Sequence, residues 1–251
     1  MKILNKLLLA SIPFLGLAAC GGSDSEDRLD VADPDARFVH AAPQAPAVTL
    51  YRGDTPQPDA TNVTFPYASN YFDVSTANAN WTLKTAAGGA TVGSVELNPA
   101  RGTKYTFVAI PGATAAAAPS LITYADPYNK SLTSTKARVR VLNASPATPA
   151  LDVYMTAPGT DFSGFTPVIS GTPYRAVGPA SGNDSVELDA GTYRMTVTLA
   201  GTRTVVTSGR LELGRNEDVL LITVPNAAVP GATRTLVKVE GTAGLTDLPA
   251  S

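Results

Sequence analysis

The chain is poor in the side chains on which most catalytic and metal sites depend. It has one cysteine and one histidine among 251 residues. A single cysteine excludes an internal disulfide framework, and one cysteine with one histidine cannot supply a zinc ligand set. No G-x-S-x-G elbow or phosphate-binding loop is present either. We therefore expect no catalytic residues, no cofactor and no metal.

Charged residues are also scarce, and neither sign dominates. They make up 16% of the chain, with 19 basic against 21 acidic side chains and a formal net charge of -2. A nucleic-acid-binding domain carries a basic patch, so we expect no nucleic-acid partner. The hydrophobic fraction of 44% is ordinary for a folded protein, while 21 glycines and 20 prolines favour many turns over long helices.

The N-terminus lacks a hydrophobic run long enough to remain as a membrane span. Residues 7–18 form an apolar stretch of 12 residues, whereas a spanning helix needs about 20. Preceded by two lysines, the stretch is typical of a secretory signal peptide. It ends in Leu17-Ala18-Ala19-Cys20, which resembles the bacterial lipobox, whose cysteine is diacylated and becomes the first mature residue. An ordinary cleavage after Ala19 is the alternative, but bulky Leu17 disfavours it.

We therefore expect residues 1–19 to be a lipoprotein signal peptide and Cys20 to attach the chain to a membrane through lipid. Each buried methylene contributes about 0.8 kcal/mol, so two or more acyl chains hold a protein firmly. The second mature residue is Gly21 rather than aspartate, which by resemblance to enterobacterial sorting favours the outer over the inner membrane. Residues 20–35 are strongly acidic and free of aromatics, which predicts a flexible tether.

An internal repeat organises the rest of the chain. Residues 37–51 align without gaps to residues 140–154, and six of 15 positions are identical. The match continues more loosely, because Trp81-Thr82-Leu83 aligns with Tyr193-Arg194-Met195. Residues 105–111 and 120–124 likewise align with 219–225 and 235–239. A period near 100 residues indicates two copies of one domain rather than a solenoid.

Within each copy, apolar and polar residues alternate with the period of a β-strand, as at Met195, Val197 and Leu199. Short strands separated by Gly/Pro turns in about 100 residues predict an all-β fold of two tandem immunoglobulin-like β-sandwiches. We expect repeat 1 at residues 36–126, a linker at 127–136, repeat 2 at 137–241 and a C-terminal tail at 242–251.

The repeat resembles a known bacterial family. Its first copy contains Val39-His40-Ala41-Ala42-Pro43-Gln44-Ala45-Pro46, and its second contains Leu151-Asp152-Val153-Tyr154 and Ala190-Gly191-Thr192-Tyr193. These segments are similar to the motifs of the domain of unknown function 4397. The resemblance implies secreted or surface proteins that are β-rich and often lipid-anchored, and it implies no established activity.

The only histidine has a repeat partner that cannot act as a base. His40 aligns with Asn143, and both precede a proline turn, at Pro43 and Pro146. We interpret both side chains as holding these turns through hydrogen bonds to the backbone.

Two further features leave functional alternatives open. Glu187 and Asp189 share one strand face, as paired carboxylates of a polysaccharide hydrolase would, although a solvated face is the commoner reading. Tyr67 and Tyr71 flank an expected loop, and we predict that they contact a ligand, since aromatic rings bind sugars and proteins. The sequence thus favours a non-catalytic, lipid-anchored envelope protein that binds a protein or a glycan. The alternatives are an envelope polysaccharide hydrolase and a structural spacer.

Overall fold

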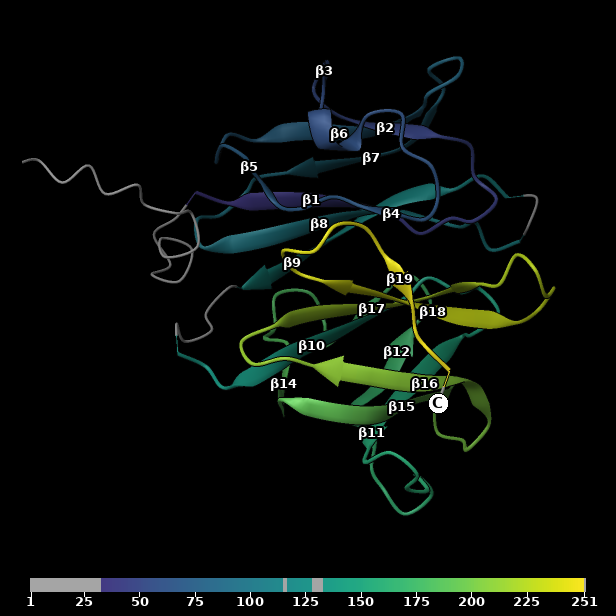
Figure 1. The fold of residues 1–251 in the computed structure, drawn as a ribbon. Helices are drawn as coiled ribbons and strands as arrows, with labels where there is room; N and C mark the ends of the chain where they lie inside the picture. Colours follow the sequence, from purple (N-terminus) through teal and green to yellow (C-terminus); the bar gives the residue numbers. More distant parts are fainter. Residues whose placement is uncertain (1–32, 115–116, 128–132, 251) are drawn as a thin grey trace, which may run out of the picture.

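The computed structural model describes residues 33–114, 117–127 and 133–250. The regular secondary structure of these residues is almost entirely β-strand, with one short 3-10 turn, η2 (Pro58–Ala60). The prediction of an all-β fold is therefore confirmed. The strands build two sandwiches of two sheets each, and the four sheets stack as successive layers (Figure 1).

The first repeat supplies the first two layers. Its outer sheet has the order β3 (Thr55–Pro56), β2 (Val48–Arg52), β6 (Ala79–Thr85), β7 (Thr91–Leu97). Its inner sheet has the order β4 (Tyr67–Ala68), β1 (Asp35–His40), β8 (Thr103–Ile110), β9 (Ser120–Pro127), with β5 (Phe72–Asp73) also paired to β1.

The second repeat supplies the other two layers. Its inner sheet has the order β13 (Val177–Gly178), β10 (Lys136–Asn143), β17 (Asp218–Pro225), β18 (Thr233–Val239), β19 (Thr246–Asp247), with β14 (Val186–Asp189) also paired to β10. Its outer sheet has the order β12 (Ile169–Pro173), β11 (Ala150–Thr156), β15 (Gly191–Leu199), β16 (Val205–Leu213).

Each inner sheet is built around a parallel pair of strands, and the two pairs are equivalent in the two repeats. β1 runs parallel to β8, and β10 runs parallel to β17, whereas the other strand pairs are antiparallel. Asp35 lies opposite Lys104 in the first repeat, and Arg138 lies opposite Asp218 in the second. These registers agree with the sequence alignments of residues 37–51 with 140–154 and of 105–111 with 219–225.

Two other parts of the sequence alignment were wrong in register. Leu50 pairs with Leu83 and its equivalent Val153 pairs with Val197, so Leu83 corresponds to Val197 and not to Met195. This error of two residues keeps every side chain on the same face, so alternation cannot reveal it. The match of β9 with β18 was wrong by one residue, because Ile122 corresponds to Leu236. Strands that have apolar side chains packed against a core on each side give no alternation that fixes register.

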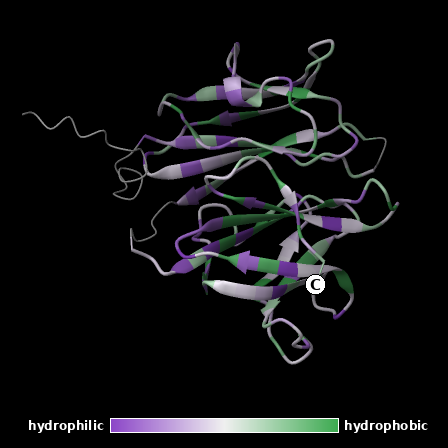
Figure 2. Ribbon diagram, viewed as in Figure 1, coloured by the Kyte–Doolittle hydropathy of each residue, from purple (hydrophilic) through white to green (hydrophobic). Residues whose placement is uncertain are grey.

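Three apolar layers separate the four sheets, and the inner strands therefore face a core on both sides. β1 is buried at all six of its positions, a pattern unlike simple alternation. Phe38, Trp81 and Phe107 belong to the core of the first sandwich. Hydrophobic residues accordingly recur along the strands of the two inner sheets, which have an apolar core on each side (Figure 2). The layer between the two inner sheets combines residues of both repeats: Val39, Val108, Ile110, Leu142, Leu220, Ile222, Val224 and Leu236.

This shared layer, which we call the junction, has a charged end and an apolar end. At the charged end, Asp126 of the first repeat lies 3.1 Å from Arg140 and 3.7 Å from Arg138 of the second. In return, Lys104 Nζ of the first repeat lies 2.9 Å from a carboxylate oxygen of Glu240 in the second. Asp126 and Glu240 occupy equivalent positions, so each repeat presents a carboxylate to cations of the other.

Residues of the expected tether and of the expected C-terminal tail also form part of the two sandwiches. β1 begins at Asp35, which is buried and lies 3.8 Å from Lys104, so the sheet starts one residue inside the expected tether. Within the expected C-terminal tail, β19 pairs with β18, and the carbonyl of Pro249 accepts a hydrogen bond from the backbone N–H of Arg210. The tail therefore joins the second sandwich.

Candidate functional site

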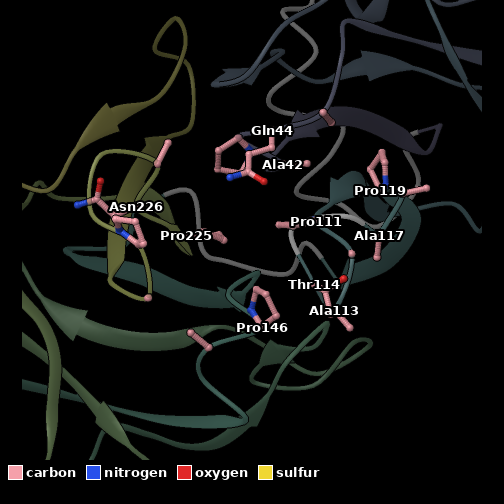
Figure 3. A pocket seen from close by; sticks show the side chains of 18 of the residues that line it. Ala42, Gln44, Pro111, Ala113, Thr114, Ala117, Pro119, Pro146, Pro225 and Asn226 are labelled. Atoms are coloured by element: carbon pink, nitrogen blue, oxygen red, sulfur yellow. The ribbon is translucent and has the colours of Figure 1, made fainter.

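A cavity of about 600 Å³ opens at the apolar end of the junction (Figure 3). Because β1 and β8 are parallel, as are β10 and β17, the loops that follow these four strands leave the sheets on the same side. The four loops surround the opening, and each sandwich contributes two of them. The site therefore exists only where both repeats meet.

Proline and alanine make up fifteen of the twenty described residues that line the cavity. The twenty described residues that line the cavity carry no ionisable side chain, and the side chains of Gln44, Thr114 and Asn226 are the polar ones among them. The lining residues are Ala42, Pro43, Gln44, Ala45, Pro46, Pro111, Gly112, Ala113, Thr114, Ala117, Ala118, Pro119, Pro146, Ala147, Pro225, Asn226, Ala227, Pro230, Gly231 and Ala232.

The repeated motif shapes these walls. Pro43 and Pro146 occupy equivalent positions after β1 and β10, and Pro111 and Pro225 do so at the ends of β8 and β17. A proline ring fixes φ and removes a sheet donor, so each proline turns the chain out of its strand. Gly112 allows the next loop to fold back closely, since a Cβ there would lie 2.4 Å from Cβ of Ala117.

His40 and Asn143 lie buried directly beneath the cavity loops. The Nδ1 atom of His40 accepts a hydrogen bond from the N–H of Ala42 (3.4 Å), and Nε2 donates to the carbonyl of Pro46 (3.3 Å). Asn143 repeats this arrangement, because its amide donates to the carbonyl of Thr148 (2.8 Å) and its oxygen accepts from the N–H of Ser145 (3.2 Å). The structural interpretation of both residues is therefore confirmed.

Burial lowers the pKa of His40 below its usual range. A neutral ring with one donating and one accepting nitrogen also suits both of its hydrogen bonds. Below about pH 6.5 the unfolded state binds a proton that the folded state resists, so stability must fall as pH falls.

We expect His40→Asn to remove this part of the pH dependence, since asparagine performs the equivalent task at position 143. Between pH 7.5 and 5.5 the wild-type free energy of unfolding should fall by about 1 kcal/mol more than that of the variant. Urea denaturation at both pH values measures the difference. Identical pH slopes for the two proteins would contradict a neutral, buried His40.

The two tyrosines predicted to contact a ligand lie toward opposite ends of β1, and neither lines the cavity. Tyr67 is half-buried opposite His40, and its hydroxyl donates to the carbonyl of Asp59. Tyr71 is half-buried at the charged end, with Arg37 and Lys104 each 4.7 Å from its ring centre. Burial raises the pKa of Tyr71 well above its usual range, which keeps its hydroxyl neutral. Ligand contact by these rings stays a prediction.

The paired carboxylates considered for a hydrolase lie on an exposed strand. Glu187 and Asp189 are both exposed on β14, opposite Arg138 and Lys136 of β10. Neither lines the cavity. Within the described ranges, no group of three or more His, Cys, Asp or Glu side chains is arranged to hold a metal ion. The geometry thus gives these carboxylates the surroundings of a solvated strand face.

The signal peptide, Cys20 and most of the expected tether lie outside the described residues. In the part of the chain that the structure does describe, no helix has the length and apolar character needed to cross a membrane. Lipid attachment at Cys20 therefore stays a prediction.

The cavity as a whole was not anticipated from the sequence. The Pro43 and Pro146 turns were recognised, and so was the equivalence of Ile110-Pro111 with Val224-Pro225. The one available signal was that prolines follow all four strands of the two parallel pairs. That these four turns converge requires the parallel pairing and the face-to-face packing of the inner sheets.

Comparison with known proteins supports the family resemblance for the first repeat. Residues 34–154 match a family model described as Domain of unknown function (DUF4397). The match covers the first repeat and, in the second, β10 and part of β11, up to Tyr154. Membership of the remaining second repeat stays a prediction. A search of curated proteins gave no match.

Solved structures with similarity to the chain include two carbohydrate-binding modules. One is a family 41 module from streptococcal virulence factors, described for alpha-glucan recognition; it is 14% identical with a TM-score of 0.25, over 76% of this chain and 93% of that chain. The other is a family 26 module of Eubacterium rectale Amy13K in complex with maltoheptaose; it is 11% identical with a TM-score of 0.23, over 83% and 97%.

Proposed function

We propose that the chain is a non-catalytic binding protein of the bacterial cell envelope, anchored through lipid on Cys20, with the junction cavity as its binding site. The observation that carries this proposal is that equivalent loops of both repeats build one uncharged cavity. A volume of about 600 Å³ lies within the range of about 300–1,000 Å³ typical of ligand pockets.

Binding fits the cavity better than catalysis does. General acid–base and nucleophilic mechanisms need a titratable or activated side chain within hydrogen-bonding reach of the substrate. Among the described residues that line the cavity, none has an ionisable side chain, and Thr114 supplies the one side-chain hydroxyl group. His40 lies beneath the loops with both ring nitrogens engaged by the backbone. A preorganised, unreactive surface is what a binding module requires.

The position of the cavity also suits a tethered protein. The predicted tether enters the fold at β1, whose first residue, Asp35, lies at the charged end of the junction. The six residues of β1 advance the chain by about 20 Å toward the cavity end. The cavity therefore opens at the end of the junction away from the tether, where an anchored protein would meet its partners.

The proposal is tested by site-specific photo-crosslinking in intact cells that produce the full chain. A crosslinking amino acid replaces Gln44, which is exposed at the cavity, or Gln57, which is partly exposed outside the cavity and serves as a control. We expect a discrete adduct with an envelope component from position 44 and none from position 57. Filling the cavity with Ala147→Trp should reduce the adduct at least tenfold.

Equal labelling at positions 44 and 57, or an adduct that survives Ala147→Trp, would show that the cavity is not the binding site. Fractionation of the same cells tests the anchor. The chain should sediment with membranes, and Cys20→Ser should release it into the soluble fraction. Membrane retention of the Cys20→Ser chain would exclude the lipid anchor.

A further inference from the structure

We infer that the inner sheet of each repeat is a docking surface for the inner sheet of the other repeat, and that this docking needs no covalent connection. The partner of repeat 1 is thus a repeat 2, from the same chain or from a second copy of it. The reason is that the contacts between the two repeats are reciprocal: equivalent residues and segments meet across the junction in both directions.

The apolar layer of the junction consists of equivalent residues. Val39 of β1 corresponds to Leu142 of β10, and Val108 of β8 corresponds to Ile222 of β17. Ten of the thirteen buried residues in this layer belong to five such pairs, of which the other three are Ala41 with Ala144, Ala68 with Val177, and Ile110 with Val224. Each sheet therefore offers its partner the same positions that it receives, which is the property of an isologous interface with two-fold symmetry.

Hydrogen bonds also cross the junction in both directions, through equivalent segments. The segment after β4 in the first repeat contains Asn70, whose side-chain oxygen accepts from Lys238 Nζ of β18 (3.3 Å). In return, the segment after β13 in the second repeat holds Ala125 of β9, the strand equivalent to β18. Ser181 Oγ accepts from the N–H of Ala125 (2.9 Å), and the N–H of Gly182 donates to its carbonyl (2.9 Å). Each repeat thus reaches over the other with the same part of its fold.

The ion pairs at the charged end follow the same rule. Asp126 of the first repeat lies 3.1 Å from Arg140, and its equivalent Glu240 in the second lies 2.9 Å from Lys104. Arg37, the equivalent of Arg140, lines the same small space as both carboxylates. All three cations are buried, and buried cations require acidic partners. Each repeat obtains such a partner from the other, so the junction selects a second repeat rather than any apolar surface.

The linker contributes to none of these contacts, since every residue named for them lies outside residues 127–136. A linker raises the effective concentration of two partners without adding to the interface between them. The apolar layer, the crossing hydrogen bonds and the ion pairs therefore hold the repeats together after the linker is cut. A repeat from another copy of the chain offers the same contacts and can take the same place, as in domain swapping.

The inference is tested on the full chain with a C-terminal affinity tag and a protease site inserted in the linker. After cleavage, capture of repeat 2 by its tag should recover repeat 1 in equimolar amount. The cut chain is then mixed with an equal amount of an untagged, isotope-labelled cut chain, unfolded in urea and refolded. We expect capture to recover labelled and unlabelled repeat 1 in equal amounts, as measured by mass spectrometry.

A charge reversal tests whether the reciprocal contacts cause this recovery. Glu240→Lys places a cation beside Lys104 and should reduce the recovery of repeat 1 from the cut chain at least tenfold. Glu212→Lys is the matched control, because Glu212 is exposed on β16 of the outer sheet. Circular dichroism of the uncut chains checks that both variants keep their strands.

Loss of repeat 1 from the cut wild-type chain, or its absence after refolding, would overturn the inference even where a variant unfolds. Equal recovery of repeat 1 from folded Glu240→Lys and Glu212→Lys chains would also overturn it. These measurements do not involve the crosslinker at position 44. Docking of the repeats and binding at the cavity can therefore fail independently of each other.

Discussion

Asp126→Asn should lower the free energy of unfolding by about 3 kcal/mol, because it removes the carboxylate that two buried arginines share. Arg138 and Arg140 are each 3% exposed, and Asp126 lies 3.7 Å and 3.1 Å from them. Removing one partner of a buried ion pair costs more than the pair contributes, because the remaining cation loses compensation. Arg140 would keep only carbonyl acceptors, such as those of Pro179 and Ala180. Arg138 would keep two more distant carboxylates, those of Asp184 and Asp218, each 4.0 Å away. Asparagine keeps the shape of the side chain, so the loss isolates the charge.

Denaturation by urea, followed by circular dichroism, measures this effect. Asp247→Asn is the matched control, since Asp247 is 63% exposed and pairs with Arg234 at 2.9 Å on the surface. Exposed pairs contribute at most about 1 kcal/mol, so the control should change stability little. Similar losses in the two variants would show that the charged end of the junction does not hold the repeats together.

Trp81→Ala should be more damaging still, with an expected loss of about 4 kcal/mol. Trp81 is fully buried in the first sandwich, and its ring stacks on Phe107 with centres 4.3 Å apart. Truncation removes the buried apolar surface and leaves a cavity. The surrounding strands cannot move to fill it, because hydrogen bonds between strands hold both sheets in place. Since domains have stabilities of about 5–15 kcal/mol, this loss would leave the protein marginally folded.

Trp81→Phe provides the control, because it preserves an aromatic ring against Phe107 and removes less volume. We expect it to cost about 1.5 kcal/mol or less. The free energies of unfolding of both variants come from urea titrations under the same conditions. A small effect of Trp81→Ala, within 1 kcal/mol of Trp81→Phe, would be inconsistent with a close-packed first core.

Sequence patterns were sufficient for the class of the fold because they reflect local requirements. Alternation at Met195, Val197 and Leu199 predicts a strand, and this segment lies in β15, although Thr196 and Thr198 on the opposite face are buried too. The alignment of residues 37–51 with 140–154 identified equivalent strands, since identical turn prolines follow them. The role of His40 could be inferred because Asn143, its counterpart, can form hydrogen bonds but cannot act as a base.

Such patterns could not determine the register of a strand wherever neighbouring sheets cover both of its faces. The slip that matched Ile122 with Val237 arose because β9 and β18 face a core on each side, so apolar residues occur without alternation. The two-residue alignment error at Trp81 kept the same side chains on the buried face, so the alternation pattern could not reveal it. Only the pairing of Leu50 with Leu83, across strands, shows the correct equivalence.

The binding site depended still more on tertiary structure. Pro43, Pro111, Pro146 and Pro225 each lie at or within three residues of the end of a strand, and from the sequence each is simply a turn. Their convergence requires two parallel strand pairs whose ends coincide and a junction that holds the two inner sheets face to face. Local chemistry therefore determined the strands, the turns and the duplication. The cavity arose only when packing brought loops about 180 residues apart in the chain to one edge, since distance along the chain carries no information about such contacts.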